Sequence, residues 1–310
     1  MKVAITGISG YIASVVADYF INDNTVEEII GIDVKPPVLI KSNKLTFVKM
    51  DVRDEEVERV FKNVDVVVHL AFIVSPNVPY KEIDSINIGG SKNVFLSAAK
   101  SGVKQIIYTS SIAAYGADPR HRFPLTEDAP RFPNKEWYYS KAKGEIEDFL
   151  DKFEKEHPDL SITRLRPAIL LGPNINNFFG KILKSKILVI LANDVKIEWV
   201  WDNDVARAIY LAYKKGIGGV FNIGGGDCLT LSEIARHFHK KAIRIPGESG
   251  ILMLKYLAKF KLINRGYYDW FNLPMKYPIC MDSSKAGKVL GWEPEFNSLE
   301  AIEKFLSDKP

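Results

Sequence analysis

The stretch Thr6-Gly7-Ile8-Ser9-Gly10-Tyr11-Ile12-Ala13 decides the fold that we predict for this chain. Residues 2–5, just before it, are a short β-branched run that predicts a buried strand. Apolar residues between positions 11 and 22 recur at helical spacing. Residues 28–33 predict a second strand that ends in an acidic residue. A strand, a glycine turn, a helix and a second strand ending in aspartate are typical of a dinucleotide-binding unit.

The small residues of this stretch explain why it suits a dinucleotide. Gly7 permits the tight turn, Gly10 lets the backbone approach a pyrophosphate, and Ala13 lets the helix pack on the strand. Free N–H groups at the start of the helix favour the phosphates. Asp33, 20 residues after Ala13, is placed to accept hydrogen bonds from both adenosine ribose hydroxyls. Because a carboxylate repels a 2′-phosphate, the sequence favours NAD over NADP, although Lys35 lies nearby.

The composition of the 310 residues, 46% hydrophobic and 26% charged, is typical of one large α/β domain or of a domain with a smaller lobe. The net charge of +4 does not indicate a protein that binds nucleic acid. Cys228 and Cys280 lack the spacing of metal ligands, so no metal site is expected and a reducing compartment is indicated. A strand that begins at residue 2 leaves no room for a signal peptide, and the most apolar window, 182–192, is too short to cross a bilayer. We therefore expect a cytoplasmic protein without a membrane partner.

Strand and helix patterns alternate through the first half of the chain. Strands are expected at 45–48, 65–71, 104–109 and 160–166, and helices at 55–61, 79–101 and 136–157. This alternation predicts a doubly wound parallel α/β sheet of the Rossmann type. We assign residues 1–170 to the dinucleotide-binding domain, which also receives about 200–224. Residues 171–310 are assigned mainly to a smaller C-terminal α/β lobe that binds the substrate.

The regular alternation ends after Gly172-Pro173-Asn174. In the second half we expect an amphipathic helix at 178–192, a turn and a helix at 199–214, a strand at 220–223 and a helix at 251–264. The aromatic residues Tyr267, Tyr268, Trp270 and Phe271 are expected to fill the smaller lobe rather than to wall a pocket. The basic residues Lys181, Lys184, Arg207 and Arg265 are interpreted as solvated charges, of which one is a candidate for binding a diphosphate.

Ligands of parallel sheets bind at the carboxyl ends of the strands, and this rule places further candidates. Asp51 and Val52 follow the third expected strand and are expected to flank the adenine. Leu70, Ala71 and Phe72 lie at the carboxyl end of the fourth strand and are expected to line the path of the pyrophosphate and the nicotinamide ribose.

Ser111, Tyr139 and Lys143 form the candidate catalytic group. Tyr139 and Lys143 are four residues apart in an expected helix, so both project from one face, and Ser111 lies just past a strand on the ligand side of the sheet. A phenol, with an ordinary pKa of about 10, is a poor base at neutral pH, but a nearby ammonium group lowers that pKa. We expect Lys143 and a positively charged nicotinamide to make Tyr139 the base that takes the proton of an alcohol while hydride leaves for the cofactor.

Taken together, these motifs resemble the extended short-chain dehydrogenase/reductase family, which includes the nucleotide-sugar epimerases and dehydratases. The motifs are Thr6-Gly7-x-x-Gly10, Asp33, Asp51-Val52, Leu70-Ala71, Ser110-Ser111 before Tyr115-Gly116, Tyr139-x-x-x-Lys143, residues 200–206, Asn222-Ile223-Gly224 and residues 282–294. They cover nearly the whole chain and are specific for the superfamily rather than for one substrate. The resemblance also implies that Asn87 supports the active site.

The resemblance implies NAD as the cofactor, a nucleotide sugar as the substrate and a homodimer. In the implied dimer, the helices expected at 79–101 and 136–157 pair across a two-fold axis. Besides the catalytic Tyr139 and Lys143, the residues expected to bind the cofactor are Gly7, Ser9, Gly10, Tyr11, Ile12, Asp33, Asp51, Val52, Leu70, Ala71, Phe72, Asn87, Thr109 and Pro167.

Several residues depart from the family pattern. Ala13 replaces the usual third glycine, and Trp201 stands where many relatives carry histidine. Ala168 stands where sugar-nucleotide enzymes commonly carry asparagine. The pair Ser140-Lys141 resembles a frequent family pair, and that alignment would place Trp137 rather than Tyr139 at the position of the family tyrosine. We prefer the alignment that uses Tyr139.

Three functions are compatible with these observations. The preferred one is an epimerase or dehydratase that acts on a nucleotide-linked sugar and keeps its NAD. The second is an alcohol dehydrogenase or ketone reductase with a different substrate, which Ala168 and Trp201 favour. The third is a dinucleotide-binding module without catalytic activity, which follows if Trp137 occupies the tyrosine position.

Overall fold

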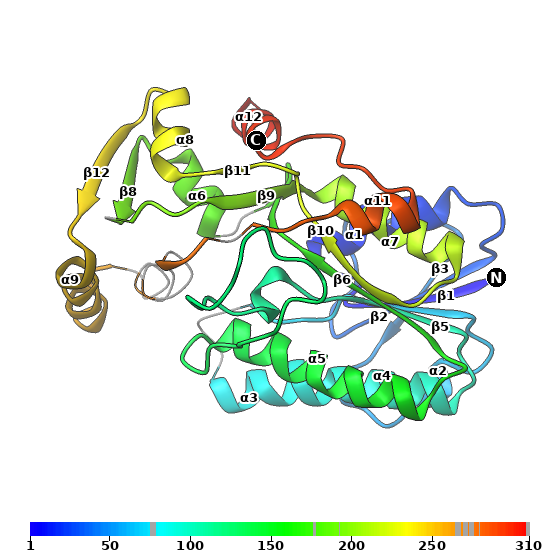
Figure 1. Cartoon of the computed structure of the whole chain (residues 1–310). Helices are drawn as coiled ribbons and strands as arrows, with labels where there is room; N and C mark the ends of the chain where they lie inside the picture. The colour runs from blue at the N-terminus through cyan, green and yellow to red at the C-terminus, as the bar shows by residue number, and fades with distance from the viewer. Residues whose placement is uncertain are drawn as a thin grey trace.

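Seven parallel strands form the central sheet, in the order β10-β6-β5-β4-β1-β2-β3 (Figure 1). The computed structural model describes residues 1–74, 79–175, 178–191, 193–263, 268, 272, 276–278 and 280–307. In sheet order the strands are β10 (Gly219–Ile223), β6 (Ser161–Pro167), β5 (Gln105–Thr109), β4 (Val66–His69), β1 (Lys2–Thr6), β2 (Glu28–Asp33) and β3 (Leu45–Lys49). The predicted doubly wound parallel α/β fold is confirmed.

Helices cover both faces of this sheet (Figure 1). One face carries α1 (Tyr11–Ile21) and α7 (Asp202–Lys215), and the other carries α2 (Val57–Val60), α4 (Gly90–Lys100) and α5 (Tyr138–Glu156). Along β1, Val3 and Ile5 belong to the cluster on the α1 side, whereas Ala4 belongs to the cluster on the α4 and α5 side. Successive strand residues point to opposite faces, which explains why a strand covered on both sides is apolar throughout.

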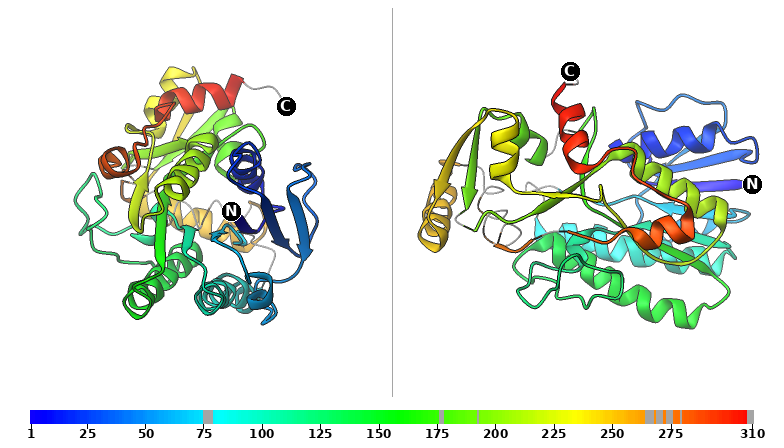
Figure 2. Two further views of the ribbon diagram at one scale, coloured as in Figure 1. Left: turned by 90° about the vertical axis from the view of Figure 1, so that its right-hand side faces the viewer. Right: turned by 45° about the horizontal axis from the view of Figure 1, so that its top comes forward.

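The second half of the chain builds a smaller lobe beyond the carboxyl ends of these strands (Figure 2). Its two small sheets consist of β7 (Ile169–Leu171), β9 (Ile197–Trp201) and β11 (Cys228–Leu229), and of β8 (Ile187–Leu191) paired with β12 (Lys241–Ile245). Its helices are α6 (Phe178–Lys184), α8 (Leu231–His237), α9 (Gly247–Lys259) and α12 (Ser298–Ser307), while α11 (Ser284–Leu290) packs against β10 and α7.

Several predicted elements of the second half are wrong in type or extent. The expected helix at 178–192 is helical only as far as Lys184, because 187–191 pair with β12 as strand β8. The turn expected at Trp199 is the middle of β9, and the helix starts at Asp202. The helix expected from 251 begins at Gly247. Arg265, Tyr267, Trp270 and Phe271 lie outside the described residues.

A disulfide bond joins Cys228 of β11 to Cys280. From the sequence, these two cysteines lack the spacing of metal ligands and were expected to indicate a reducing compartment; the bond between them was not predicted. Their pairing over 52 residues connects β11 to the segment that leads into α11.

The buried carboxylate of Glu147 connects helix α5, on which it lies, to strand β6 and to the end of strand β5. It accepts hydrogen bonds from Arg164 Nη1 at 3.0 Å, from Arg166 Nη2 at 2.8 Å and Nε at 2.9 Å, and from Ser110 Oγ at 2.7 Å. Burial by itself would raise the pKa of Glu147, but these partners lower it to about 2. The carboxylate is therefore ionised throughout the physiological pH range.

We predict that Glu147→Gln destabilises the fold, because the substitution removes the anion that pairs with buried Arg166 and one of the three that pair with Arg164. The expected loss of unfolding free energy is about 3–5 kcal/mol, measured by urea denaturation at pH 7. Glu145→Gln on the same helix is the control, because Glu145 is exposed and pairs with Lys141 at 3.7 Å. A loss of less than about 1 kcal/mol for Glu147→Gln would show that the buried pairs contribute little.

Candidate active site

The glycine turn between β1 and α1 lies close to the end of β4. Gly7 has a φ of +73°, and a Cβ placed on it would lie 2.6 Å from the backbone nitrogen of Ala71. A Cβ on Gly10 would lie 3.0 Å from the carbonyl oxygen of Gly7. Gly10 is the residue before helix α1 and has no side chain that could cap the first N–H groups of the helix. The N–H groups of Gly7 and Gly10 already donate, to the carbonyls of Ile32 and Gly7, so the donors available to a pyrophosphate are those of the first turn of α1.

Asp33 connects the end of β2 to this turn. Its carboxylate accepts hydrogen bonds from the backbone N–H of Ser9 at 3.1 Å and of Lys35 at 3.3 Å. The hydroxyl of Ser9 donates to the carbonyl oxygen of Lys35. The carboxylate thus lies beside the glycine turn, at the position expected for a partner of the adenosine ribose.

The residues expected to flank the adenine follow β3, and those expected along the pyrophosphate follow β4. Val52 packs so closely on Gly90 that a Cβ there would lie 2.5 Å from Val52 Cγ2. The Arg53 guanidinium beside Asp51 lowers the pKa of that carboxyl group, with Nη2 and Oδ2 2.7 Å apart. Leu70 continues the β4 ladder by donating from its N–H to the carbonyl of Thr6 at 3.1 Å.

Asn87 lies in a π-helical turn, Ser85–Gly89, that joins α3 (Tyr80–Asp84) to α4 and interrupts the continuous helix predicted for 79–101. Its side chain binds the segment after β4 twice, accepting from the N–H of Ile73 at 2.7 Å and donating to the Ile73 carbonyl at 2.9 Å. It also donates to the Tyr138 hydroxyl at 3.2 Å. Asn87 therefore fixes the loop that carries Phe72 relative to the start of α5.

The structure brings Ser111, Tyr139 and Lys143 together. Ser111 follows β5; its hydroxyl accepts from the Ala113 N–H at 3.1 Å and lies near enough to the Tyr139 hydroxyl to lower the pKa of that phenol. Lys143 lies one turn after Tyr139 on α5, and its ammonium nitrogen is 5.9 Å from the centre of the Tyr139 ring. These positions agree with the spacing argument made from the sequence.

The Lys143 side chain is buried under Phe72. Its Nζ donates to the Thr109 carbonyl at 2.8 Å and to the Tyr108 hydroxyl at 3.2 Å. The same nitrogen lies 3.9 Å from the centre of the Phe72 ring, which in turn meets the Tyr139 ring edge to face at 5.5 Å. Phe72 follows Ala71, the residue against which Gly7 packs, so these contacts connect the catalytic group to the glycine turn.

Burial dominates the electrostatics of this group. It lowers the pKa of Lys143 to about 7, against the opposing charge of Glu147. Burial also raises the pKa of Tyr139 above its ordinary value, and the hydrogen bond with Ser111 opposes that rise. The sequence analysis predicts that Lys143 lowers the pKa of Tyr139. In the structure the protein groups alone leave that pKa raised.

The alternative alignment through Trp137 is not supported by the geometry. Trp137 precedes α5, and its ring lies 6.2 Å from that of Tyr139. Tyr138 is held by Asn87, and burial raises its pKa to about 12. The Tyr139 ring, in contrast, lies beside both Phe72 and Lys143, at 5.5 Å and 5.9 Å.

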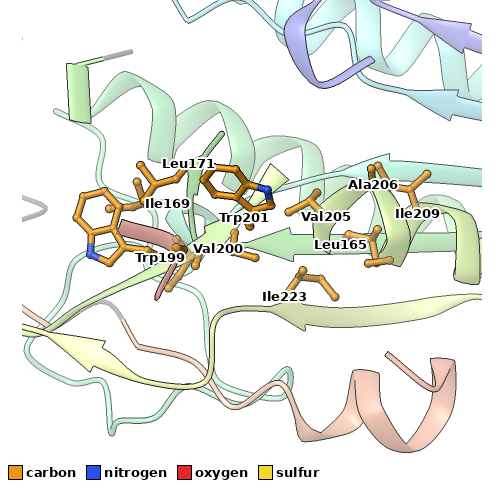
Figure 3. Close-up of a cluster of buried hydrophobic side chains, with 14 of the residues drawn as sticks. Leu165, Ile169, Leu171, Trp199, Val200, Trp201, Val205, Ala206, Ile209 and Ile223 are labelled. Atoms are coloured by element: carbon orange, nitrogen blue, oxygen red, sulfur yellow. The ribbon is translucent and has the colours of Figure 1, made fainter. Parts of the chain in front are cut away.

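Trp201, one of the departures from the family pattern, is a core residue. Figure 3 shows it with Trp199 among the aliphatic side chains of β7, β9 and α7. It is 4% exposed, and its ring meets Phe296 at 6.0 Å. Ala168 is buried as well, and its N–H donates to the Ile223 carbonyl at 2.9 Å. Both departures therefore have a packing role.

Two of the candidate phosphate-binding cations have partners within the chain. Arg207 pairs with Asp204 at 2.9 Å and also donates to the Glu293 carbonyl. Lys184 lies over the Phe305 ring at 4.7 Å.

A hollow of about 940 Å³ lies between the loop after β10 and α11. Lys196 and Lys288 are among the residues that line it, and none of the predicted site residues does.

Sequence reasoning missed two residues of this site. Tyr108 accepts a hydrogen bond from Lys143, and Glu147 ties α5 to Ser110, the neighbour of Ser111. Glu147 lies four residues after Lys143 and the sixth strand carries two arginines, so the sequence contained a signal for this ion pair.

Thr109, a predicted cofactor residue, has a buried hydroxyl for which the described residues offer no hydrogen-bond partner.

Residues 3–224 match the family model described as the NAD dependent epimerase/dehydratase family. A putative UDP-glucose 4-epimerase of Methanocaldococcus jannaschii is 26% identical, over 98% of this chain and 97% of that protein. The N-acetyl-alpha-D-glucosaminyl-diphospho-ditrans,octacis-undecaprenol 4-epimerase of Escherichia coli is 31% identical, over 65% of this chain and 64% of its own length. A solved UDP-glucose 4-epimerase of Thermotoga maritima, with UDP-glucose bound, superposes with a TM-score of 0.77 at 25% identity, covering 99% of this chain and 98% of that one.

We predict that Gly7→Ala destabilises the protein and weakens NAD binding. The side chain would meet the backbone of Ala71 in a conformation with positive φ, at an expected cost of about 1–3 kcal/mol. Gly89→Ala is the control, because a Cβ there meets nothing within 4 Å and its φ is −62°. Thermal unfolding with and without NAD measures both effects, and equal behaviour of the two variants would contradict the close approach.

We predict that stability increases with pH between 7 and 9 because of Lys143. Its folded pKa of about 7 lies below the ordinary 10.5, so the unfolded chain binds more protons in this range and protonation favours unfolding. The expected gain in unfolding free energy is about 2 kcal/mol, measured by urea denaturation at each pH. Lys143→Met should remove it, whereas Lys152→Met, an exposed lysine of the same helix, should keep it. An unchanged slope in Lys143→Met would refute the assignment.

Proposed function

Because the chain belongs to the NAD-dependent epimerase/dehydratase family, we propose that it epimerises or dehydrates a nucleotide-linked sugar, with Tyr139 as the base. The observation that carries the proposal is the continuous contact from the glycine turn to the catalytic group. Gly7 packs on Ala71, and the next residue, Phe72, touches both Tyr139 and Lys143. A proton acceptor and a nicotinamide ring would therefore meet at one place.

The residues present fit NAD. The turn at Gly7 and Gly10 has no room for side chains, and the start of α1 has no side-chain cap. Asp33 is placed for the ribose and Thr109 offers a buried hydroxyl, while Lys143 and Tyr139 lie next to Phe72. When bound, NAD supplies the ring carbon that accepts a hydride and gives it back.

The chain's own residues handle the proton. The phenolate form of Tyr139 takes the proton of the sugar hydroxyl and becomes a phenol, and Ser111 lies near enough to Tyr139 to steady the same sugar oxygen. Protonated Lys143, whose nitrogen is held near Tyr139 through Thr109 and Tyr108, favours that phenolate. Phe72 covers this nitrogen and keeps bulk water from it.

The relatives favour a sugar joined to a diphosphate over a simple alcohol. Two of those described above are named as UDP-glucose 4-epimerases, one of them with UDP-glucose bound. The residues that motivated an alcohol dehydrogenase, Trp201 and Ala168, are explained by packing. A homodimer through α4 and α5, which lie side by side on one face of the sheet, remains part of the proposal, and Leu96 of α4 is exposed there.

We predict that the purified protein converts a UDP- or dTDP-sugar to its epimer or its 4-keto-6-deoxy product without net formation of NADH. The reason is that the hydride removed from the sugar returns within the same site. Product analysis by chromatography, with absorbance at the NADH wavelength recorded in parallel, measures both quantities. Net NADH formation from a plain alcohol would instead establish the dehydrogenase.

Tyr139→Phe should lower the rate about 10²–10⁴-fold, because it removes the proton acceptor and leaves the ring in place. Tyr138→Phe is the matched control on the neighbouring tyrosine, whose hydroxyl meets Asn87. It should keep activity within about tenfold of the unaltered chain. Full activity in Tyr139→Phe would assign the base elsewhere.

A further inference from the structure

The outer face of helix α9 is apolar, which distinguishes it from the other exposed helix faces of this protein. Of the fourteen large apolar side chains that are exposed among the described residues, five lie between positions 252 and 262. They are Leu252 at 51% exposure, Met253 at 48%, Tyr256 at 52%, Phe260 at 68% and Leu262 at 70%. Leu252, Tyr256 and Phe260 are spaced four residues apart, so they form one stripe along the helix.

The opposite side of α9 anchors the helix to the small lobe. Gly250 and Leu254 are buried, and a Cβ on Gly250 would lie 3.1 Å from Ile245 of β12. The helix lies at the end of the molecule farthest from β3 and the N-terminus (Figure 1). The stripe therefore faces outward from the tip of the small lobe.

The segment that contains this stripe is rich in positive charge. Residues 240–263 contain six basic residues and one acidic residue, a net charge of +5, whereas the whole chain carries +4. All of the net positive charge is thus concentrated in this segment. Lys255 and Lys259 lie along one margin of the stripe and are exposed. A hollow of about 200 Å³ beside the helix is lined by Lys255, Lys276 and Leu252, with Glu248, Ile251 and Tyr268.

We propose that α9 docks on the surface of an anionic phospholipid membrane. A helix with an apolar face and lysines at its margin lies in the interface, with its apolar side among the acyl chains and its lysines at the phosphate groups. An acidic protein partner would match the lysines, but it would not need an outward row of leucine, methionine and phenylalanine. The described helices are not of the kind that crosses a membrane. The attachment is thus peripheral, and it revises the expectation that the protein has no membrane partner.

The test is co-sedimentation of the full chain with vesicles, together with its mass by light scattering. We expect binding to phosphatidylcholine vesicles that contain about 25% phosphatidylglycerol, at least tenfold stronger than to phosphatidylcholine alone and weakened by salt. The double variant Leu252→Gln/Phe260→Gln and the double variant Lys255→Gln/Lys259→Gln should each lose most of this binding. Val38→Gln/Leu39→Gln is the matched control, because these side chains are 81% and 61% exposed on a loop of the large domain.

Two outcomes would overturn the proposal. One is the absence of binding to the anionic vesicles at low salt, or binding that neither α9 variant reduces. The other is a dimeric mass that falls to the monomer in Leu252→Gln/Phe260→Gln without any vesicle binding, which would assign the stripe to a second copy of the chain. Circular dichroism confirms that each variant is folded, and the lysine variant and the salt dependence test the proposal independently of the apolar variant. The outcome does not depend on the reaction that the active site catalyses.

Discussion

The candidate catalytic group depends on a buried carboxylate to which the proposed mechanism assigns no chemical step. Glu147 is fixed by Arg164 and Arg166 from β6 and by Ser110 from the end of β5. Since Ser110 precedes Ser111, and Glu147 lies one turn after Lys143, the same anion sets the distance between the two halves of the catalytic group. A buried ion pair contributes little net stability compared with apolar packing, but its geometry is specific. The relative positions of Ser111 and Lys143 depend on this specific geometry.

Sheet topology places the other half of the site. The parallel strands β1, β2 and β4 end at the same edge of the sheet. The glycine turn, Asp33 and the segment from Leu70 to Phe72 therefore meet there as a consequence of the strand order. Asn87 then ties this segment to the start of α5, through Ile73 and Tyr138. A π-helical turn is an unusual place for a side chain, and such turns often occur at functional sites. Here the turn directs the amide of Asn87 inward.

The first half of the chain could be predicted because each strand there is a separate apolar run followed by a turn signal. Prediction failed at 187–191, where five apolar residues fit a helix or a buried strand equally, and only the pairing with β12 decides. Tyr139 was predicted from its spacing to Lys143, whereas the preference for it over Trp137 is supported by ring contacts with Phe72 and Lys143 that no spacing reports. The partners of Glu147 are 17 to 37 residues away, a separation that no local pattern reports.

Burial of the site determines the protonation of its titratable groups. Burial lowers the pKa of Lys143 and raises that of Tyr139, so both groups are driven toward their neutral forms. In a low-dielectric site, one additional positive charge acts much more strongly on the phenol than it would in water. A cation beside Tyr139 would therefore favour loss of the phenol proton. In the proposed mechanism an oxidised nicotinamide would supply that charge and a reduced one would not, so burial of the site would couple the ionisation of Tyr139 to the redox state of the cofactor.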